Sequence, residues 1–206
     1  MQILNKRISG IFTFLALCAV LLAVTGCARY ARQVALVYEP VVSAKGGSGD
    51  LYIVIPPDQQ TRNDKVKWVI GKVENEDGDT IDEVMSPLSG YELVQDALGQ
   101  ELRKAGYGVI PSVARPGAKA NAIDLVKVNL SLDQVSSLTD IKATCRMIVS
   151  LEVFKNGALV KKLQYDSTFN KTDIQDRNLV AKVLLRDTLQ AAMKRAVPDI
   201  IAALSE

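Results

Sequence analysis

Hydrophobic and polar residues alternate along two long stretches of the chain, residues 126–133 and 143–154. Their apolar positions are Val126, Val128, Leu130 and Leu132, then Ala143, Cys145, Met147, Val149, Leu151 and Val153. Alternation with a period of two predicts antiparallel strands that bury one face. Asn156-Gly157 follows directly and is the residue pair most typical of a tight hairpin turn. It predicts a third strand over residues 159–169, paired with the second.

A first helix is predicted near residue 90. Ser89 and Glu92 match a capping box, in which each side chain accepts a hydrogen bond from a free backbone amide. Ser86-Pro87 offers a competing start, and Gly106 marks the end. The expected buried stripe, at spacings of three and four, is Tyr91, Val94, Leu98, Leu102 and Ala105.

A second helix is predicted to start near Asp176, and Pro198 is expected to break or kink it. Its apolar face consists of Val180, Ala181, Leu184, Leu185, Thr188, Ala191 and Ala192. Its polar face consists of Lys182, Arg186, Gln190 and Lys194. A basic row of this kind can contact anionic lipid, but it is more often plain solvated helix surface.

Shorter apolar runs predict strands over residues 34–38, 51–55, 66–73 and 107–110. The glycine-rich residues 43–50 predict a flexible loop, and residues 74–83 predict an acidic, solvated turn around Asp77-Gly78. Together these elements predict one α+β domain over residues 34–206. We expect a mostly antiparallel sheet with two amphipathic helices packed on one face.

The N-terminal segment carries the strongest motif. Lys6 and Arg7 provide a positive start, and an apolar run follows over residues 11–24. This run is shorter than the about 20 residues of a membrane-spanning helix, but it suits a secretory signal. An uncleaved anchor helix is the alternative interpretation.

The run ends in Val24-Thr25-Gly26-Cys27, which resembles the lipobox of bacterial lipoproteins. The resemblance implies that residues 1–26 are removed as a signal peptide. Cys27 then carries a diacylglycerol on its sulfur and a third acyl chain, a palmitate-type lipid, on its new amine, and residues 27–33 form a short tether. Three acyl chains anchor firmly, since each buried CH₂ contributes about 0.8 kcal/mol.

Ala28 follows this cysteine, whereas aspartate at that position marks inner-membrane retention in lipoproteins of enteric bacteria. In a host with two membranes, the resemblance therefore implies a protein that is lipid-anchored in the outer membrane and faces the periplasm. The membrane is thus one expected partner, through the acyl chains.

Composition narrows the classes of function. The chain has 206 residues and no histidine, which excludes Ser-His-Asp and Cys-His catalysis, imidazole metal ligands and histidine pH switches. Lys6 and Arg7 account for the whole excess of 25 basic over 23 acidic residues. The domain is therefore formally neutral, and without a basic cluster it lacks the positive surface that nucleic-acid binding needs.

The three cysteines have different expected fates. Cys18 lies in the removed segment, Cys27 is the lipidation site, and Cys145 remains alone. No internal disulfide can then form in the mature chain. Because Cys145 falls on the apolar side of its predicted strand, we expect an inert, packed thiol.

Two loops resemble ligand sites but lack essential residues. Aligning Gly78 with the glycine of an EF-hand places Val73 and Val84 at ligand positions, so no calcium site is predicted. Residues 46–49 lack both the P-loop lysine and the dinucleotide-binding spacing. Neither a metal nor a cofactor is expected.

Thr139 with Lys142, and Thr168 with Lys171, have the spacing of a hydroxyl–lysine dyad. No neighbouring residue gives a reason for the lysine to act as a base. No catalytic residue is therefore predicted, and Cys27 is the one candidate site.

Several segments together resemble the YajG-type bacterial lipoproteins, a family of envelope proteins. The segments are the lipobox at Cys27, residues 34–40 (VALVYEP), 69–73 (VIGKV), 91–107 (YELVQDALGQELRKAGY) and the closing amphipathic helix. The resemblance implies an α+β fold and a membrane anchor, and it supplies no catalytic residues.

The sequence leaves three functional hypotheses. We favour a non-enzymatic accessory or scaffold module that is lipid-anchored and binds another envelope component, an envelope protein of unknown identity. The alternative is a lipid or small-ligand carrier, auxiliary to an envelope transport system, with an apolar cleft between sheet and helices. A cell-wall hydrolase ranks last, because glycosidases need two facing carboxylates and the acids here are scattered.

Overall fold

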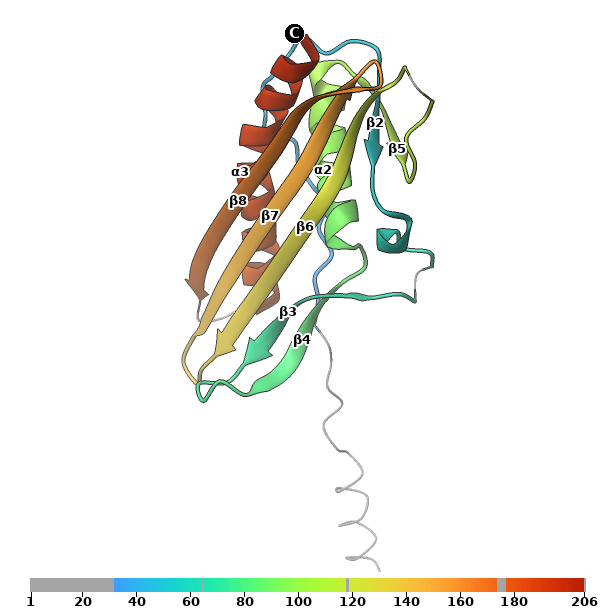
Figure 1. Cartoon of the computed structure of the whole chain (residues 1–206). Coiled ribbons are helices and arrows are strands. Elements are labelled where there is room, and N and C mark those ends of the chain that lie inside the picture. Colours follow the sequence, from blue (N-terminus) through green and yellow to red (C-terminus); the bar gives the residue numbers. More distant parts are fainter. Residues whose placement is uncertain (1–31, 64, 118, 174–176, 206) are drawn as a thin grey trace, which may run out of the picture. The chain divides into compact units, whose positions relative to one another are not determined.

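The computed structural model describes residues 32–63, 65–117, 119–173 and 177–205 (Figure 1). They belong to one compact unit, Ala31–Glu206. The strands are β1 (Arg32–Gln33), β2 (Asp50–Val54), β3 (Trp68–Glu74), β4 (Thr80–Ser86), β5 (Gly108–Ser112), β6 (Asn121–Ser136), β7 (Ile141–Lys155) and β8 (Ala158–Asp173). The helices are the short 3₁₀ helix η1 (Pro57–Gln59), α2 (Gly90–Ala105) and α3 (Arg177–Ser205).

All eight strands belong to one sheet, and the sheet is mixed. The strand order is β1-β4-β3-β6-β2-β5, and β7 and β8 extend the sheet from β6. The pairs β3–β4, β6–β7 and β7–β8 are antiparallel, whereas β1–β4, β2–β5, β2–β6 and β3–β6 are parallel. The predicted α+β domain with two helices is confirmed. The longest strand pairs are antiparallel, as expected, but the short strands add parallel pairs, so the sheet is mixed and not purely antiparallel. Alternation shows that a strand has one buried face and does not show the direction of its neighbour.

Strands β6, β7 and β8 form a long meander, and both helices lie on one face of it (Figure 1). We call the opposite face of these strands the outer face. All six inward residues predicted for β7, from Ala143 to Val153, are buried as expected. The predicted alternation of β6 is wrong at Val126, which is 54% exposed. A register shift between Leu125 and Lys127 changes which residues face inward from that point.

Helix α2 begins and ends as predicted. Ser89 Oγ accepts from Glu92 N at 3.1 Å, and Glu92 Oε2 accepts from Ser89 N at 2.9 Å, which completes the capping box. Gly106 ends the helix with a left-handed φ of 114°. The predicted apolar stripe is buried except for Tyr91, which is half-buried at the first turn.

Helix α3 covers β7 and β8 with the predicted apolar face. The expected break at Pro198 is wrong, because the helix continues through it to Ser205. Proline removes one backbone donor, here to the carbonyl of Lys194. The buried side chains of Val197 and Ile200 on either side hold this turn against the sheet.

Three short predictions need correction. Residues 34–38 have no regular secondary structure, and the strand before them is β1. The acidic stretch 74–83 contains a turn only at residues 75–79, where Gly78 has a φ of 87°, and β4 starts at Thr80. Residues 43–49 form an irregular loop, and β2 begins at Asp50. The loop is bound at two points, since Gly47 N donates to Ala105 O at 3.0 Å and Gly49 O accepts from Gly108 N at 2.9 Å.

The backbones of β3 and β6 approach each other so closely at Gly71 that no larger residue fits there. A Cβ atom on Gly71 would lie 1.9 Å from the carbonyl oxygen of Leu132. The register of β3 with β4 is irregular at this position, between Val69 and Gly71. Close backbone approach therefore brings β3 onto the edge of β6, where Val73 pairs with Gln134.

We expect Gly71→Ala to lower the free energy of unfolding by about 1–3 kcal/mol or more, because the new methyl group must displace backbone atoms. Urea unfolding followed by the fluorescence of Trp68 measures this change. Gly117→Ala is the matched control, because a Cβ there meets no atom within 4 Å. Equal stability of both variants would contradict the close approach of β3 and β6.

Candidate functional site

Cys27, the one predicted site residue, lies outside the described residues. The structure shows where the chain that follows it joins the domain. Strand β1 pairs in parallel with β4, with Arg32 opposite Val84 and Gln33 opposite Met85. Val34 N then donates to Met85 O at 2.7 Å. The chain is therefore attached to the edge of the sheet within a few residues of Cys27.

Residues 34–42, which we call the strap, connect this edge to the helices. Val34, Tyr38 and Val42 are buried in the hydrophobic core. The backbone of the strap is bound from both helices, since Lys104 Nζ of α2 donates to Pro40 O at 3.3 Å and Gln190 Nε2 of α3 donates to Glu39 O at 3.1 Å. The strap is thus an integral layer of the fold.

A buried carboxylate holds the strap on α2. Glu101 is 1% exposed and accepts hydrogen bonds from Tyr38 Oη at 2.7 Å, Val41 N at 2.7 Å and Val42 N at 3.1 Å. Burial, together with the adjacent Glu101 carboxylate, raises the pKa of the Tyr38 hydroxyl well above its ordinary value. Buried carboxylates are stable in proteins when their oxygens are hydrogen-bonded, so this site is structural.

A second polar cluster binds the loop before β3 to the start of α2. Besides capping the helix, Glu92 accepts from Thr61 N at 2.8 Å. Trp68 Nε1 donates to Thr61 Oγ1 at 2.9 Å, and Ser89 Oγ donates to Gln59 O at 2.6 Å. These side chains satisfy one another and leave no group directed at a ligand.

Charged and aromatic residues connect α3 to β8. Tyr165 Oη donates to Asp199 at 2.6 Å, and the guanidinium of Arg195 lies 5.3 Å from the centre of the Tyr165 ring. Arg195 Nη1 also donates to Asp166 O at 3.2 Å, and the Asp166 carboxylate pairs with Arg146 at 2.7 Å. Burial and the hydrogen bond to Asp199 raise the pKa of Tyr165, whereas Arg146 lowers the pKa of Asp166.

Two acids, Asp124 and Glu152, lie opposite each other on β6 and β7. Burial raises the pKa of Asp124, although Arg115 pairs with it at 2.8 Å. Glu152 pairs with Lys162 at 2.8 Å. Each carboxylate therefore has a basic partner. Asp124 Oδ1 nevertheless is buried without a hydrogen bond in the described structure, which agrees with the raised pKa of this carboxyl.

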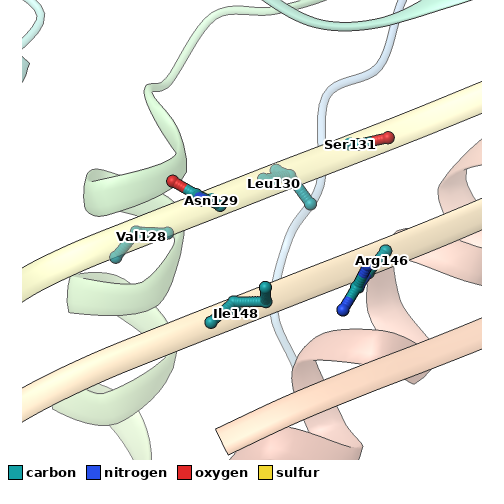
Figure 2. A pocket seen from close by; sticks show the side chains of 6 residues that line it. All are labelled: Val128, Asn129, Leu130, Ser131, Arg146 and Ile148. Atoms are coloured by element: carbon teal, nitrogen blue, oxygen red, sulfur yellow. The ribbon is translucent and has the colours of Figure 1, made fainter. Parts of the chain in front are cut away.

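The described part of the domain has hollows on its surface, three of which are lined as follows. The first, of about 400 Å³, is lined by residues from β6 and β7: Val128, Asn129, Leu130, Ser131, Arg146 and Ile148 (Figure 2). The second, of about 270 Å³, lies further along β6–β8 around Val126, Ser150 and Gln164. The third, of about 300 Å³, lies around Gln95 at the ends of β2 and β5. All three mix polar and apolar side chains.

The residue pairs that resemble hydroxyl–lysine dyads are not assembled into sites. Thr168 and Lys171 are three positions apart on β8, so their side chains point to opposite faces. Thr139 lies in the turn before β7, and Lys142 is an exposed residue of that strand. Within the described residues, no group of three His, Cys, Asp or Glu side chains is placed to hold a metal ion.

Cys145 is fully buried in the core, as predicted for a packed thiol. Burial raises the pKa of its thiol from 9.0 to about 11, an effect that a hydrogen bond with Thr188 partly offsets. Burial disfavours the thiolate, which is the reactive form. The position in the core was readable from the alternation along β7.

Comparison with known proteins gives structural likenesses of low similarity. No family model and no curated protein matches the chain. A Xanthomonas campestris protein of family DUF330 has 10% identity and a TM-score of 0.48 over 83% of this chain and 95% of its own. A minor lipoprotein from Acinetobacter baumannii has 10% identity and a TM-score of 0.43, over 74% and 90% of the two chains.

The rare lipoprotein B from Shewanella oneidensis is 11% identical, with a TM-score of 0.31 over 64% of this chain and 93% of its own. At these TM-scores the likenesses assign neither family nor function. The resemblance to YajG-type lipoproteins therefore stays a prediction. Among the described residues, no helix has both the length and the apolar character needed to cross a membrane.

We expect Glu101→Gln to destabilise the domain by about 1–3 kcal/mol, because the amide nitrogen cannot accept and leaves a buried donor of the strap unsatisfied. Chemical denaturation measures the loss. Glu39→Gln makes the same change on an exposed strap residue, and we expect it to stay within about 0.5 kcal/mol of the parent chain. Similar losses in both variants would contradict the role of Glu101.

We expect Cys145 to resist iodoacetamide at pH 8 in the folded chain and to react once the chain is unfolded. A pKa raised from 9.0 to about 11 lowers the thiolate fraction at pH 8 about a hundredfold, and burial further blocks the reagent. Mass spectrometry of the peptide that contains Cys145 reports the modification. Rapid labelling of the native chain would show that this strand opens to solvent.

Proposed function

We propose that this chain is a lipoprotein of the bacterial cell envelope, anchored through acyl chains on Cys27. The observation that carries the proposal is the sequence Val24-Thr25-Gly26-Cys27 at the end of a short apolar run with a basic start. Ala28 at the next position supports sorting to the outer membrane, and the folded domain would face the periplasm.

The way the chain joins the domain supports a short connection to the membrane. Five residues span at most about 18 Å, and β1 is already paired with β4 at Arg32. A lipid on Cys27 would therefore keep this sheet edge near the bilayer surface. The strap then continues into the core, where Glu101 binds it, so the anchor is connected directly to the body of the fold.

We further propose that the anchored domain has no enzymatic activity and acts as an accessory or scaffold module for another envelope component. Its charged clusters support this role, because Asp124, Glu152 and Asp166 each form an ion pair with a basic side chain. The carrier hypothesis requires an apolar cleft between sheet and helices. The strap places Tyr38 and Val42 in the core beside the helices, and the first two hollows described above are lined by strand residues of β6, β7 and β8 without any helix residue.

We expect Cys27→Ala to abolish incorporation of radiolabelled palmitate and to release the chain from the membrane fraction. The substitution removes the sulfur that accepts the lipid, and without it the modification cannot begin. Labelling in growing cells followed by gel autoradiography gives the result. Cys18→Ala changes the other cysteine of the N-terminal segment and should leave labelling intact, whereas persistent labelling of Cys27→Ala would overturn the anchor.

A further inference from the structure

Strand β8 is an edge of the sheet in the described part of the chain. It pairs with β7 along its whole length, and no described strand lies on its other side. The pairing with β7 runs without a register shift from Lys161 to Asp173, and β8 contains no proline. A long, regular edge of this kind presents rows of backbone donors and acceptors to any strand that can pair with it.

One contact shows which backbone groups face this free edge. Arg195 of α3 donates to the carbonyl oxygen of Asp166 at 3.2 Å. Because the donor does not come from β7, this carbonyl points away from β7. Backbone groups alternate in direction along a strand, so those of Lys162 and Gln164 point to the free edge as well.

The side chains of β8 are complementary to a second copy of the same strand. Identical edges pair symmetrically only in antiparallel fashion, about a two-fold axis. With the axis at Gln164, Lys162 of each copy lies opposite Asp166 of the other copy. Leu163 then lies opposite Tyr165, and both are on the inner face, since they pair with the buried Leu151 and Val149 of β7.

Charge fixes this register. The side chains of Lys162 and Asp166 are 70% and 46% exposed, so both are accessible. Across the two copies, the ion pairs Glu152–Lys162 and Asp166–Arg146 would join into one row of alternating charge on the outer face. Moving the axis by one residue in either direction places Gln164 opposite Lys162 or Asp166, and both new charge pairs are lost.

We propose that β8 is a self-association edge, which pairs antiparallel with β8 of a second copy about Gln164. The lysines of the edge disfavour strands that offer no acid opposite them, and β8 itself supplies that acid. In the single chain, Arg195 donates a hydrogen bond to Asp166 O. In the pair, the backbone amide of Lys162 from the second copy donates to this oxygen instead. The proposal goes beyond the proposed function and does not depend on the lipid anchor.

The two-fold axis runs perpendicular to the sheet, so both copies present the same face in the same direction. Two anchored chains can therefore reach one bilayer that lies parallel to the sheet. The association buries the free edge of each copy, and the joined meanders form one continuous sheet across the axis.

The test is disulfide trapping of the full chain in cells that carry Gln164→Cys. Directly opposed residues of an antiparallel pair have Cα atoms about 5.5 Å apart, which is within the range of a disulfide. Thr168→Cys is the matched control, on the same face of the same strand and also exposed. In this register the two copies of residue 168 lie eight positions apart, about 26 Å.

After mild oxidation, we expect a band at twice the mass of the chain for Gln164→Cys. Thr168→Cys should give no more than the parent chain, whose three cysteines set the background. Absence of the Gln164→Cys band, equal trapping at both positions, or a band at the mass of a different partner would each overturn the proposal.

A charge exchange in the Gln164→Cys background tests the register. We expect Lys162→Asp or Asp166→Lys alone to reduce trapping at least tenfold, and the two together to restore it. Each substitution also faces Glu152 or Arg146 of its own chain, so protease resistance is measured alongside to show that the chain is folded. Undiminished trapping in the single variants, or no recovery in a folded double variant, would overturn the register.

Discussion

The fold depends on the pairing of β6 with three neighbours. On one side β6 pairs with β7 from Ala122 to Ser136. On its other side, β2 pairs with residues 121–124 and β3 pairs with Gln134 and Val135. A strand of this length can therefore join two short parallel strands and a long antiparallel meander into one sheet. The close approach at Gly71 and Leu132 is the constraint that lets β3 reach this edge.

The strap, which lies between β1 and β2 in the chain, is bound to the rest of the fold along its length. The strap lacks secondary structure, and its backbone groups must find partners elsewhere. Glu101 accepts two of its amides, and Lys104 and Gln190 donate to two of its carbonyls. The strap is thus held on α2 by hydrogen bonds to a buried carboxylate.

Long, regular elements were predictable because neighbouring residues alone determine their pattern. The inward face of β7 and the capping box of α2 appear in the structure as the sequence indicated. Elements that depend on distant contacts were not predictable. The strap reads as a strand because Val34 to Tyr38 is apolar, yet it is buried against helices rather than paired in the sheet.

The same difference between local pattern and distant contacts applies to the polar residues Glu101, Lys162 and Asp166. The helical spacing places Glu101 on the apolar face of α2, three residues after Leu98 and four before Ala105. The groups that bind its carboxylate could not be predicted, since they lie about 60 positions earlier in the chain. Likewise, the complementarity of Lys162 and Asp166 about Gln164 acquires meaning only once β8 is known to be an edge.

The sequence by itself determined the lipobox at Cys27, the absence of histidine chemistry, the hairpin at Asn156-Gly157 and the two amphipathic helices. Each of these rests on residues within a few positions of one another. Tertiary structure alone decided the mixed sheet, the continuation of α3 through Pro198, the partners of Glu101 on the strap and the edge position of β8. The direction of a neighbouring strand, the partners of a buried charge and the position of a strand at an edge are set by segments far apart in the chain. The pattern of neighbouring residues therefore does not predict these three features.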